Sequence, residues 1–220
     1  MSKKKRDNGE AVDFSEDVSL ISEMGDIPDN PWTIIERWVP IKEGSTERSC
    51  VGTLATVDGK DVVSSRSMNI KLRDEQLLLA THRGSKKWRG DLNKQPASWH
   101  VYWPKQRRQL DIRGTLVEAS AALAEDWWIK RPSNMDLVST LSRQSQAASL
   151  ATIENIRRRA RGDSPGSVPG DKLPKPEPFI VLRLIPFEIE FWEGTFDRVH
   201  NRYLFENKNG TGWKRSLLFP

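Results

Sequence analysis

The sequence has little of what several common classes of protein require. Its 220 residues include one cysteine, Cys50, so no intrachain disulfide can form, which is typical of a reducing compartment. No obvious base lies near Cys50, and we interpret it as a buried, inert thiol. No run reaches the ~18–20 apolar residues of a membrane span, and the opening MSKKKRDNGE lacks the apolar segment of a secretory signal. We therefore expect a cytoplasmic protein with no membrane contact.

Several cofactor and metal motifs are also missing. The chain has no G-x-G-x-x-G, no Walker loop, no C-x-x-C and no H-E-x-x-H. Its three histidines, His82, His100 and His200, are too far apart for metal-ligand spacing, so we expect no metal site. The excess of 35 Lys plus Arg over 30 Asp plus Glu suits anionic small molecules and does not demand nucleic acid. We interpret the basic run IRRRARG as a solvated helix face.

Periodicity predicts one domain with many strands. Residues 1–26 are polar and charged, and we expect a flexible arm there, followed by a single domain over residues 27–220. In IPDNPWTIIERWVPI, an Asp29 or Asn30 cap and Pro31 at the first turn predict a helix that ends before Pro40. Further helices are expected in three segments: SKKWRGDLNKQ, SAALAEDWWIKRP and SQAASLATIENIRRRARG. Strands are expected in VGTLATV, DVVSSRSMNIKL, QLLLATH, SWHVYW, RRQLDIRGTLVEAS, FIVLRLI, FEIEFWEG, RVHNRYLFE and GWKRSLLF. About eight or nine strands with peripheral helices predict an α+β, mainly β fold built on an antiparallel barrel or sandwich.

The stretch DRVHNRYLF combines a strand pattern with basic side chains. Arg198, His200 and Arg202 follow one another at every second position. On an extended chain this spacing turns all three to one face. We interpret that face as a binding surface.

Four other clusters combine basic or amide groups with strand or helix-start positions. Arg66 and Lys71, five apart on one strand, would project to opposite faces. Ser85, Lys86 and Lys87 are expected at a helix N-terminus, which favours an anion. The other two clusters are Gln109 within a strand and the triplet Arg143-Gln144-Ser145, which is expected to open the long helix. Each of the four clusters alone could also be a solvated charge, a helix cap or an amide facing water.

Ten stretches, taken in order, resemble one family. They are PDNPWTIIERW, TLATVDG, the R-x-x-x-x-K of RSMNIK, THRGSKK, RRQLDIRG, KRPS, SRQS, IEFWEG, DRVHNR and GWKRSLLFP. In this order they resemble the pyridoxamine 5′-phosphate oxidase family of FMN-binding split β-barrels, over nearly the whole chain from about residue 28 to 220. The most specific part is the C-terminal F-W-x-G followed by R-x-H-x-R.

The resemblance implies a homodimer with two FMN molecules at the subunit interface, and it implies residue roles. Gln144 and Ser145 would reach the flavin from the other subunit. Arg198 and His200 would be catalytic and would also bind substrate, together with Lys71, Trp127, Arg131 and Met135. The implied FMN-binding residues are Arg66, Ser67, Met68, Asn69, Lys71, Ala80, Thr81, Lys86, Lys87, Gln109, Gln144, Ser145, Trp192 and Arg202.

Two positions depart from the vitamin B6 oxidases of this family. A Tyr and a Ser that would hold the substrate phosphate are replaced by Trp127 and Met135, which removes two hydrogen-bond donors. Together with ATHRGSKK, WIKRP and STLSRQS, this resembles the flavin oxidases of phenazine biosynthesis. The resemblance implies oxidation of a reduced, carboxylate-bearing nitrogen heterocycle, an anionic aromatic substrate, by hydride transfer to FMN with O2 as the final acceptor.

Three alternatives stay open from the sequence. The chain could be a pyridoxine/pyridoxamine 5′-phosphate oxidase despite Trp127 and Met135. It could be a flavin-binding protein without enzymatic activity, although Arg198 and His200 argue against that. It could also be a basic interaction protein with no cofactor.

Overall fold

In the described part of the chain, a closed antiparallel barrel of six strands is extended by two further strands. The computed structural model describes residues 21, 27–41, 47–90, 94–162, 172–207 and 210–220, without the side chain of Asn134. The strands are β1 (Arg48–Val57), β2 (Val63–Arg73), β3 (Gln76–His82), β4 (Gln95–Trp103), β5 (Arg108–Glu118), β6 (Phe179–Glu193), β7 (Asn201–Glu206) and β8 (Lys214–Leu217).

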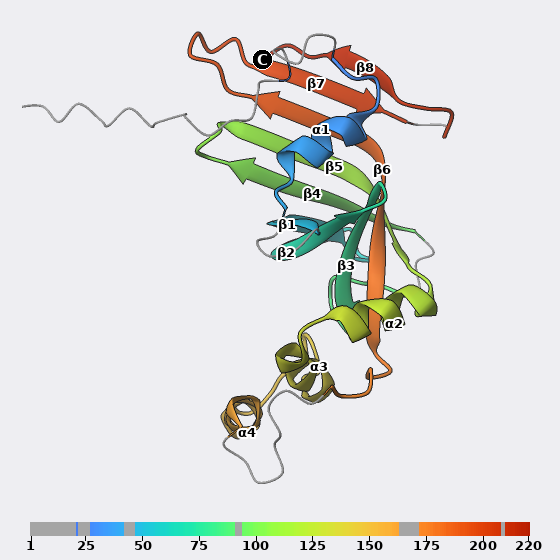
Figure 1. Ribbon diagram of the computed structural model, residues 1–220, viewed down its shortest axis with the longest axis vertical. Coiled ribbons are helices and arrows are strands. Elements are labelled where there is room, and N and C mark those ends of the chain that lie inside the picture. Colours follow the sequence, from blue (N-terminus) through green and yellow to red (C-terminus); the bar gives the residue numbers. More distant parts are fainter. Residues whose placement is uncertain (1–20, 22–26, 42–46, 91–93, 163–171, 208–209) are drawn as a thin grey trace, which may run out of the picture.

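Strand pairing closes the barrel. The sheet order is β3-β2-β1-β4-β5-β6-β7-β8. An additional pairing of β3 with β6 closes the first six strands of this order into a ring. Beyond the ring, β7 and β8 continue the sheet from the second half of β6 (Figure 1). This confirms the predicted fold class, a mainly β, α+β split barrel with peripheral helices.

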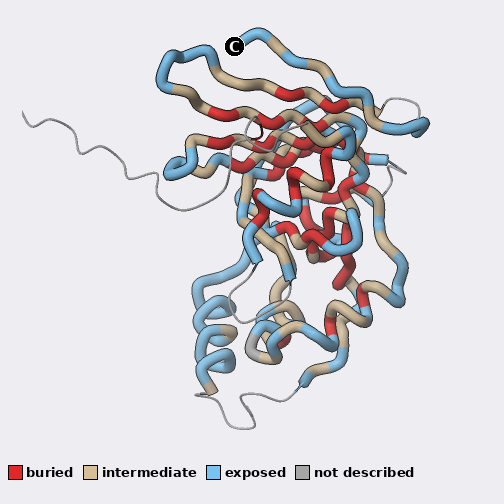
Figure 2. Tube along the Cα trace, turned by 45° about the horizontal axis from the view of Figure 1, so that its top comes forward, coloured by how far each residue is buried: buried red, intermediate tan, exposed pale blue. Residues whose placement is uncertain are grey.

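Four α-helices lie around the strands, α1 (Pro31–Trp38), α2 (Ala121–Lys130), α3 (Asp136–Leu141) and α4 (Leu150–Arg161), with a 3-10 turn at Ser133–Met135. As predicted, Asn30 caps α1, its side chain accepting a hydrogen bond from the backbone N–H of Trp32 at 3.1 Å. The apolar face of α1 is buried in the main core. By contrast, α4 has no buried residue and lies at the far end of the molecule (Figure 2).

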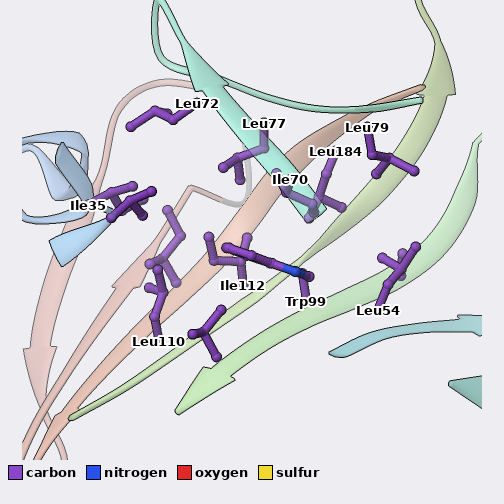
Figure 3. Close-up of a cluster of buried hydrophobic side chains, with 14 of the residues drawn as sticks. Ile35, Leu54, Ile70, Leu72, Leu77, Leu79, Trp99, Leu110, Ile112 and Leu184 are labelled. Atoms are coloured by element: carbon purple, nitrogen blue, oxygen red, sulfur yellow. The ribbon is translucent and has the colours of Figure 1, made fainter. Parts of the chain in front are cut away.

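The main core fills the inside of the barrel, and a second apolar cluster lies between α2 and the strands at one end of it. Trp99 and Leu54 are fully buried among the inward-facing side chains of β1–β6 (Figure 3). A second, smaller cluster joins Trp128 of α2 to Phe179 of β6, with their rings 4.9 Å apart. Helix α2 is therefore held against the β3–β6 end of the barrel.

Three predicted elements differ from the structure. The segment after Ser85 forms turns up to Gly90, not a helix, and β4 already begins at Gln95. Helix α4 starts at Leu150, because the hydroxyl of Ser149 caps it by accepting from the N–H of Thr152 at 3.1 Å. The 3-10 turn and α3 were not expected from the sequence.

The third difference is that FIVLRLI and FEIEFWEG form one continuous strand, β6. Pro186 interrupts the pattern in the sequence, but it lies at a bulge, where the register with β5 shifts between Arg113 and Gly114. A bulge tolerates proline because a ladder N–H is not needed there. The two predicted strands are thus two halves of a 15-residue strand.

The predicted arm lies almost entirely outside the described residues. Ile21 is described: it is fully buried, and its backbone N–H donates to the carboxylate of Glu193 at 2.8 Å. The division into an arm and a domain at residue 27 stays a prediction. Among the described residues no helix is both long enough and apolar enough to cross a membrane.

The bulge makes Gly114 intolerant of a side chain. A Cβ at this position would overlap the carbonyl oxygen of Ile185. We expect Gly114→Ala to lower the free energy of unfolding by about 1–3 kcal/mol, measured by chemical denaturation. The control is Gly84→Ala, whose Cβ would meet no heavy atom within 4 Å and should change stability by less than about 0.5 kcal/mol. Equal stabilities for the two variants would contradict the bulge geometry.

Candidate functional site

A cavity of about 750 Å³ lies between the outer face of β2 and β3 and the helices α2 and α3. Strand β2 contributes Met68, Asn69 and Lys71 to its wall, and β3 contributes residues 80–82. The 3-10 turn brings Met135 to the opposite side. The other lining residues are Glu47, Trp127, Lys130, Arg131, Pro132, Ser139, Gln144 and Phe179.

Beside the end of the cavity lined by Thr81 and Gln144 lie two cations without a carboxylate, Lys87 and Arg66. The Lys87 ammonium donates to Ser85 Oγ at 2.5 Å and to Thr81 Oγ1 at 3.1 Å. The Arg66 guanidinium donates to Thr56 Oγ1 at 2.8 Å and to Ser64 Oγ at 2.6 Å. In the part of the chain that the structure describes, neither cation forms a salt bridge. Every partner named here is a neutral hydroxyl.

Burial makes this cationic pair unfavourable without an anion. It lowers the pKa of Lys87, and the nearby Arg66 guanidinium lowers it further. Burial also lowers the pKa of Arg66. Two positive charges that are desolvated and repel each other are stabilised by an anion between them. The residues at this end therefore fit the phosphate of FMN.

The segment around Ser145 completes this end of the cavity. The backbone N–H of Lys86 donates to Ser145 Oγ at 3.1 Å, and the Thr81 hydroxyl donates to Gln144 Oε1 at 3.2 Å. The resemblance implied that Gln144 and Ser145 reach over from another subunit, but both contact their own chain. Neither this segment nor Ser85–Lys87 begins a helix, so the predicted helix N-terminal anion sites are wrong. In this structure the positive charge at this place comes from the side chains of Lys87 and Arg66, not from a helix N-terminus.

The opposite end of the cavity is aromatic. The Lys71 ammonium lies 4.5 Å from the ring centre of Trp127. The Arg131 guanidinium lies over Trp128 and Phe179, at 4.8 and 5.2 Å from their ring centres. Burial lowers the pKa of Arg131, and the negative charge of Asp136 opposes that effect.

The remaining predicted residues lie elsewhere on the chain. Gln109, Trp192 and Arg202 line a separate hollow of about 270 Å³ on β5, β6 and β7. The guanidinium of Arg202 donates to the carboxylate of Glu190 at 2.8 Å, and this hydrogen bond raises the pKa of Arg202. The imidazole of His200 lies 4.7 Å from the Trp192 ring.

Arg198, His200 and Arg202 do not share a strand face. Strand β7 begins at Asn201, and Arg198 lies in a turn with φ 65°. The carboxylate of Asp197 accepts from Thr195 Oγ1 at 2.5 Å and from the N–H of Val199 at 3.0 Å, which bends the chain. The prediction based on alternate spacing is therefore wrong for Arg198.

The turn nevertheless fixes the His200 imidazole. The backbone N–H of Thr195 donates to His200 Nδ1 at 3.1 Å. In the neutral ring the proton therefore lies on Nε2. The Arg198 side chain is exposed, and no partner for it is seen within the described residues.

One strand separates the two groups of predicted residues. Thr81 pairs with Ile180 of β6, and Trp192 comes twelve residues later on the same strand. At about 3.3 Å per residue this is roughly 40 Å along the strand. The groups lie toward opposite ends of the molecule in Figure 1. A ligand contacting both groups needs a second copy of the chain.

Sequence reasoning did not find six residues that line the cavity: Glu47, His82, Lys130, Pro132, Ser139 and Phe179. Glu47 and Ser139 have no local signal in the sequence. His82 directly follows Thr81, and it is buried with no hydrogen-bond partner for Nε2 among the described residues. Burial lowers the pKa of His82, and the charges of Arg131 and Lys87 lower it further. Each of these effects favours the neutral form of the His82 imidazole. The described residues contain no cluster of His, Cys, Asp or Glu able to hold a metal ion. Burial raises the pKa of the Cys50 thiol to about 12, in keeping with an inert side chain.

The chain is similar to several known proteins. Residues 179–220 match the family model described as the pyridoxine 5′-phosphate oxidase C-terminal dimerisation region. The chain is 32% identical over 197 residues to a dihydrophenazinedicarboxylate synthase of Pseudomonas chlororaphis, covering 88% of this chain and 85% of the relative. It is 30% identical over 212 residues to a pyridoxine/pyridoxamine 5′-phosphate oxidase of Paraburkholderia phymatum, covering 95% and 98%.

A solved structure has the same fold. The crystal structure of PhzG from Burkholderia lata in complex with tetrahydrophenazine-1-carboxylic acid aligns with a TM-score of 0.75 and 27% identity. The alignment covers 92% of this chain and 98% of that one.

The cationic end of the cavity gives a test of phosphate binding. We expect Lys87→Met to weaken FMN binding at least tenfold, because a charge-assisted contact to the phosphate is lost. Binding of riboflavin, which has no phosphate, should change little. Both dissociation constants can be measured by quenching of flavin fluorescence.

The matched control is Lys60→Met, which removes an exposed lysine from the β1–β2 turn. It should leave both dissociation constants unchanged. An equal loss of FMN and riboflavin affinity in Lys87→Met would assign Lys87 a structural role instead.

Proposed function

Because the chain belongs to the pyridoxamine 5′-phosphate oxidase family, we propose that it is an FMN-dependent oxidase of phenazine-type secondary metabolism. The proposed substrate is a reduced, carboxylate-bearing nitrogen heterocycle, oxidised by hydride transfer with O2 as the final acceptor. Relatives named as phenazine-pathway enzymes, and a similar solved structure with a reduced phenazine acid, support this choice. We also propose a cytoplasmic homodimer.

The observation that carries the proposal is the aromatic end of the cavity. The indole of Trp127 and the thioether of Met135 line it, where a vitamin B6 oxidase would offer a tyrosine and a serine hydroxyl to a phosphate. Losing two hydrogen bonds to a charged group costs roughly 1.5–3 kcal/mol each. A flat ring over Trp127 suits this wall better than a phosphate ester does.

The chain's own residues divide the proposed work between the two ends of the site. FMN, when bound, would supply the hydride-accepting chemistry. Lys87, Arg66, Gln144 and Ser145 would hold its phosphate end. Gln109, Trp192 and Arg202 would come from the second copy.

Arg198 and His200 would act on the substrate. The Arg198 guanidinium, exposed on its turn, would bind a substrate carboxylate and orient the ring. His200 Nε2 would hold or release a proton, since Nδ1 is already occupied by the N–H of Thr195. Arg202 would stabilise negative charge on the reduced cofactor.

The second candidate function is pyridoxine/pyridoxamine 5′-phosphate oxidase. The Paraburkholderia relative, at 30% identity over 95% of this chain, is the observation that favours it. A substrate screen with reduced phenazine carboxylates and pyridoxine 5′-phosphate, followed by O2 consumption, decides between the two. Turnover of pyridoxine 5′-phosphate alone would overturn the main proposal.

We expect Arg198→Ala to stay yellow, with an unchanged FMN dissociation constant, and to lose turnover by about 100-fold or more. The reason is that Arg198 would orient the substrate and not the cofactor. The measurement is steady-state O2 consumption beside an absorption spectrum. Arg37→Ala, an exposed arginine on α1, is the control and should match the wild type. Wild-type turnover in Arg198→Ala would remove this role.

Mixing subunits tests whether each site needs two copies. Lys87→Met and Arg202→Ala each impair both sites of a homodimer. In a heterodimer of the two variants, one site carries both changes and the other carries neither. Random mixing should therefore restore about a quarter of the wild-type turnover, because half of the dimers are mixed. Purified one-to-one mixtures, unfolded and refolded together, are assayed by O2 consumption. No recovery, with dimers present, would contradict a shared site.

A further inference from the structure

The cation that borders the aromatic end of the cavity already has an anionic partner. The Lys71 ammonium donates to Glu47 Oε2 at 2.6 Å while lying over the Trp127 ring. Both charged side chains also line the cavity. The Lys71 side chain is 25% exposed, and that of Glu47 44%. An anion approaching Lys71 therefore meets the Glu47 carboxylate at the same place.

The second cation at this end is matched in the same way. Arg131 Nε lies 3.5 Å from Asp136 Oδ1, and Asp136 is fully buried. The same carboxylate lies 3.0 Å from Lys172 Nζ. The Arg131 guanidinium also donates to the backbone carbonyl of Met135 at 3.1 Å. Part of its hydrogen-bonding capacity is thus used within the chain.

The cations that line the aromatic end of the cavity and the cation pair beside its other end therefore differ in charge balance. Arg66 and Lys87 are held by hydroxyl groups and by uncharged amide or carbonyl oxygens, whereas Lys71 and Arg131 each have a carboxylate within 4 Å. A dianionic phosphate is stabilised at the first end and repelled by Glu47 at the second. A flat ring with at most one negative charge is repelled less than a dianion and gains contact with Trp127.

We infer that Glu47 is a specificity-determining residue that neutralises Lys71 and excludes phosphate monoesters from the aromatic end of the cavity. This inference rests on the proposed function, because it concerns the substrate part of that site. Exclusion works by placing an unfavourable charge against the wrong ligand. It selects a ring acid or an uncharged ring edge over a phosphorylated pyridine.

The test is binding without turnover. The probe is 4-deoxypyridoxine 5′-phosphate, which lacks the oxidisable group of pyridoxine 5′-phosphate, and its control ligand is 4-deoxypyridoxine. Isothermal titration of the FMN-loaded protein should give about tenfold tighter binding of the phosphorylated probe by Glu47→Gln than by the wild type. Binding of 4-deoxypyridoxine should be equal in both. In the Lys71→Met background, the gain from Glu47→Gln should be clearly smaller, because the cation that Glu47 neutralises is gone and only the direct repulsion of the phosphate is relieved.

Glu154→Gln is the matched control, since it removes a carboxylate paired to Arg157 on the exposed helix α4. It should not change the affinity for the probe. Equal probe affinity in the wild type and Glu47→Gln overturns the inference, as does a gain that is undiminished in the Lys71→Met background. These outcomes differ from failure of the proposed function, which is measured by turnover of reduced phenazine carboxylates. A tenfold gain in probe affinity in Glu47→Gln, together with no turnover of reduced phenazine carboxylates by the wild type, would contradict the proposed function and leave the inference about Glu47 standing.

Discussion

The pairing of β3 with β6 is the interaction on which the fold and the site depend. It closes the six-stranded ring, with Leu77 opposite Leu184 and His82 opposite Phe179. The same pairing puts Thr81 at the cavity and gives α2 an apolar surface to pack on, through Phe179. Because β6 continues for a further nine residues beyond Leu184, it also carries Trp192 to the other end of the molecule. One strand thus supports both halves of the proposed site and keeps them apart.

This separation has a consequence for assembly. A rigid strand cannot bring its two ends to one small ligand, so the chain can complete such a site only by meeting a second copy in the opposite sense. A two-fold axis does this, because each copy then offers its first half to the second half of the other. The match of residues 179–220 to a dimerisation region fits this arrangement. The cofactor site and the oligomer would then have the same geometric cause.

Local signals predicted the elements whose ends are set locally. Asn30 and Pro31 define the start of α1, and alternating apolar residues define the strands. The failures come where a distant contact decides. The buried side-chain amide of Gln95 accepts from the backbone N–H of Arg89 and donates to the backbone carbonyl of Val57 in β1. These contacts tie the segment after Ser85 to the barrel, and it forms turns instead of a helix. Pro186 is accommodated because the register between β5 and β6 shifts beside it, so that β6 itself bulges there.

The turn at Asp197 shows the limit of spacing arguments. Alternation predicts one face only if the chain is extended, and the side-chain hydrogen bonds of Asp197 bend it before β7 starts. The resemblance still named Arg198 and His200, because motif order does not depend on local conformation. It could not reveal that Lys71 has a carboxylate partner, since Glu47 lies 24 residues away.

Charge pairing separates the two kinds of cation in this protein. Surface pairs such as Lys130 with Asp126, at 2.6 Å, contribute little to stability. Arg66 and Lys87 are different, because burial lowers the pKa of both and nothing among the described residues compensates their charge. Such a pair of cations lowers the stability of the free protein, and a bound anion would offset this loss. Lys71 carries no such cost, since Glu47 compensates it before any ligand arrives. In the proposed function, a compensating carboxylate is therefore missing where a phosphate would bind and present where a ring would bind.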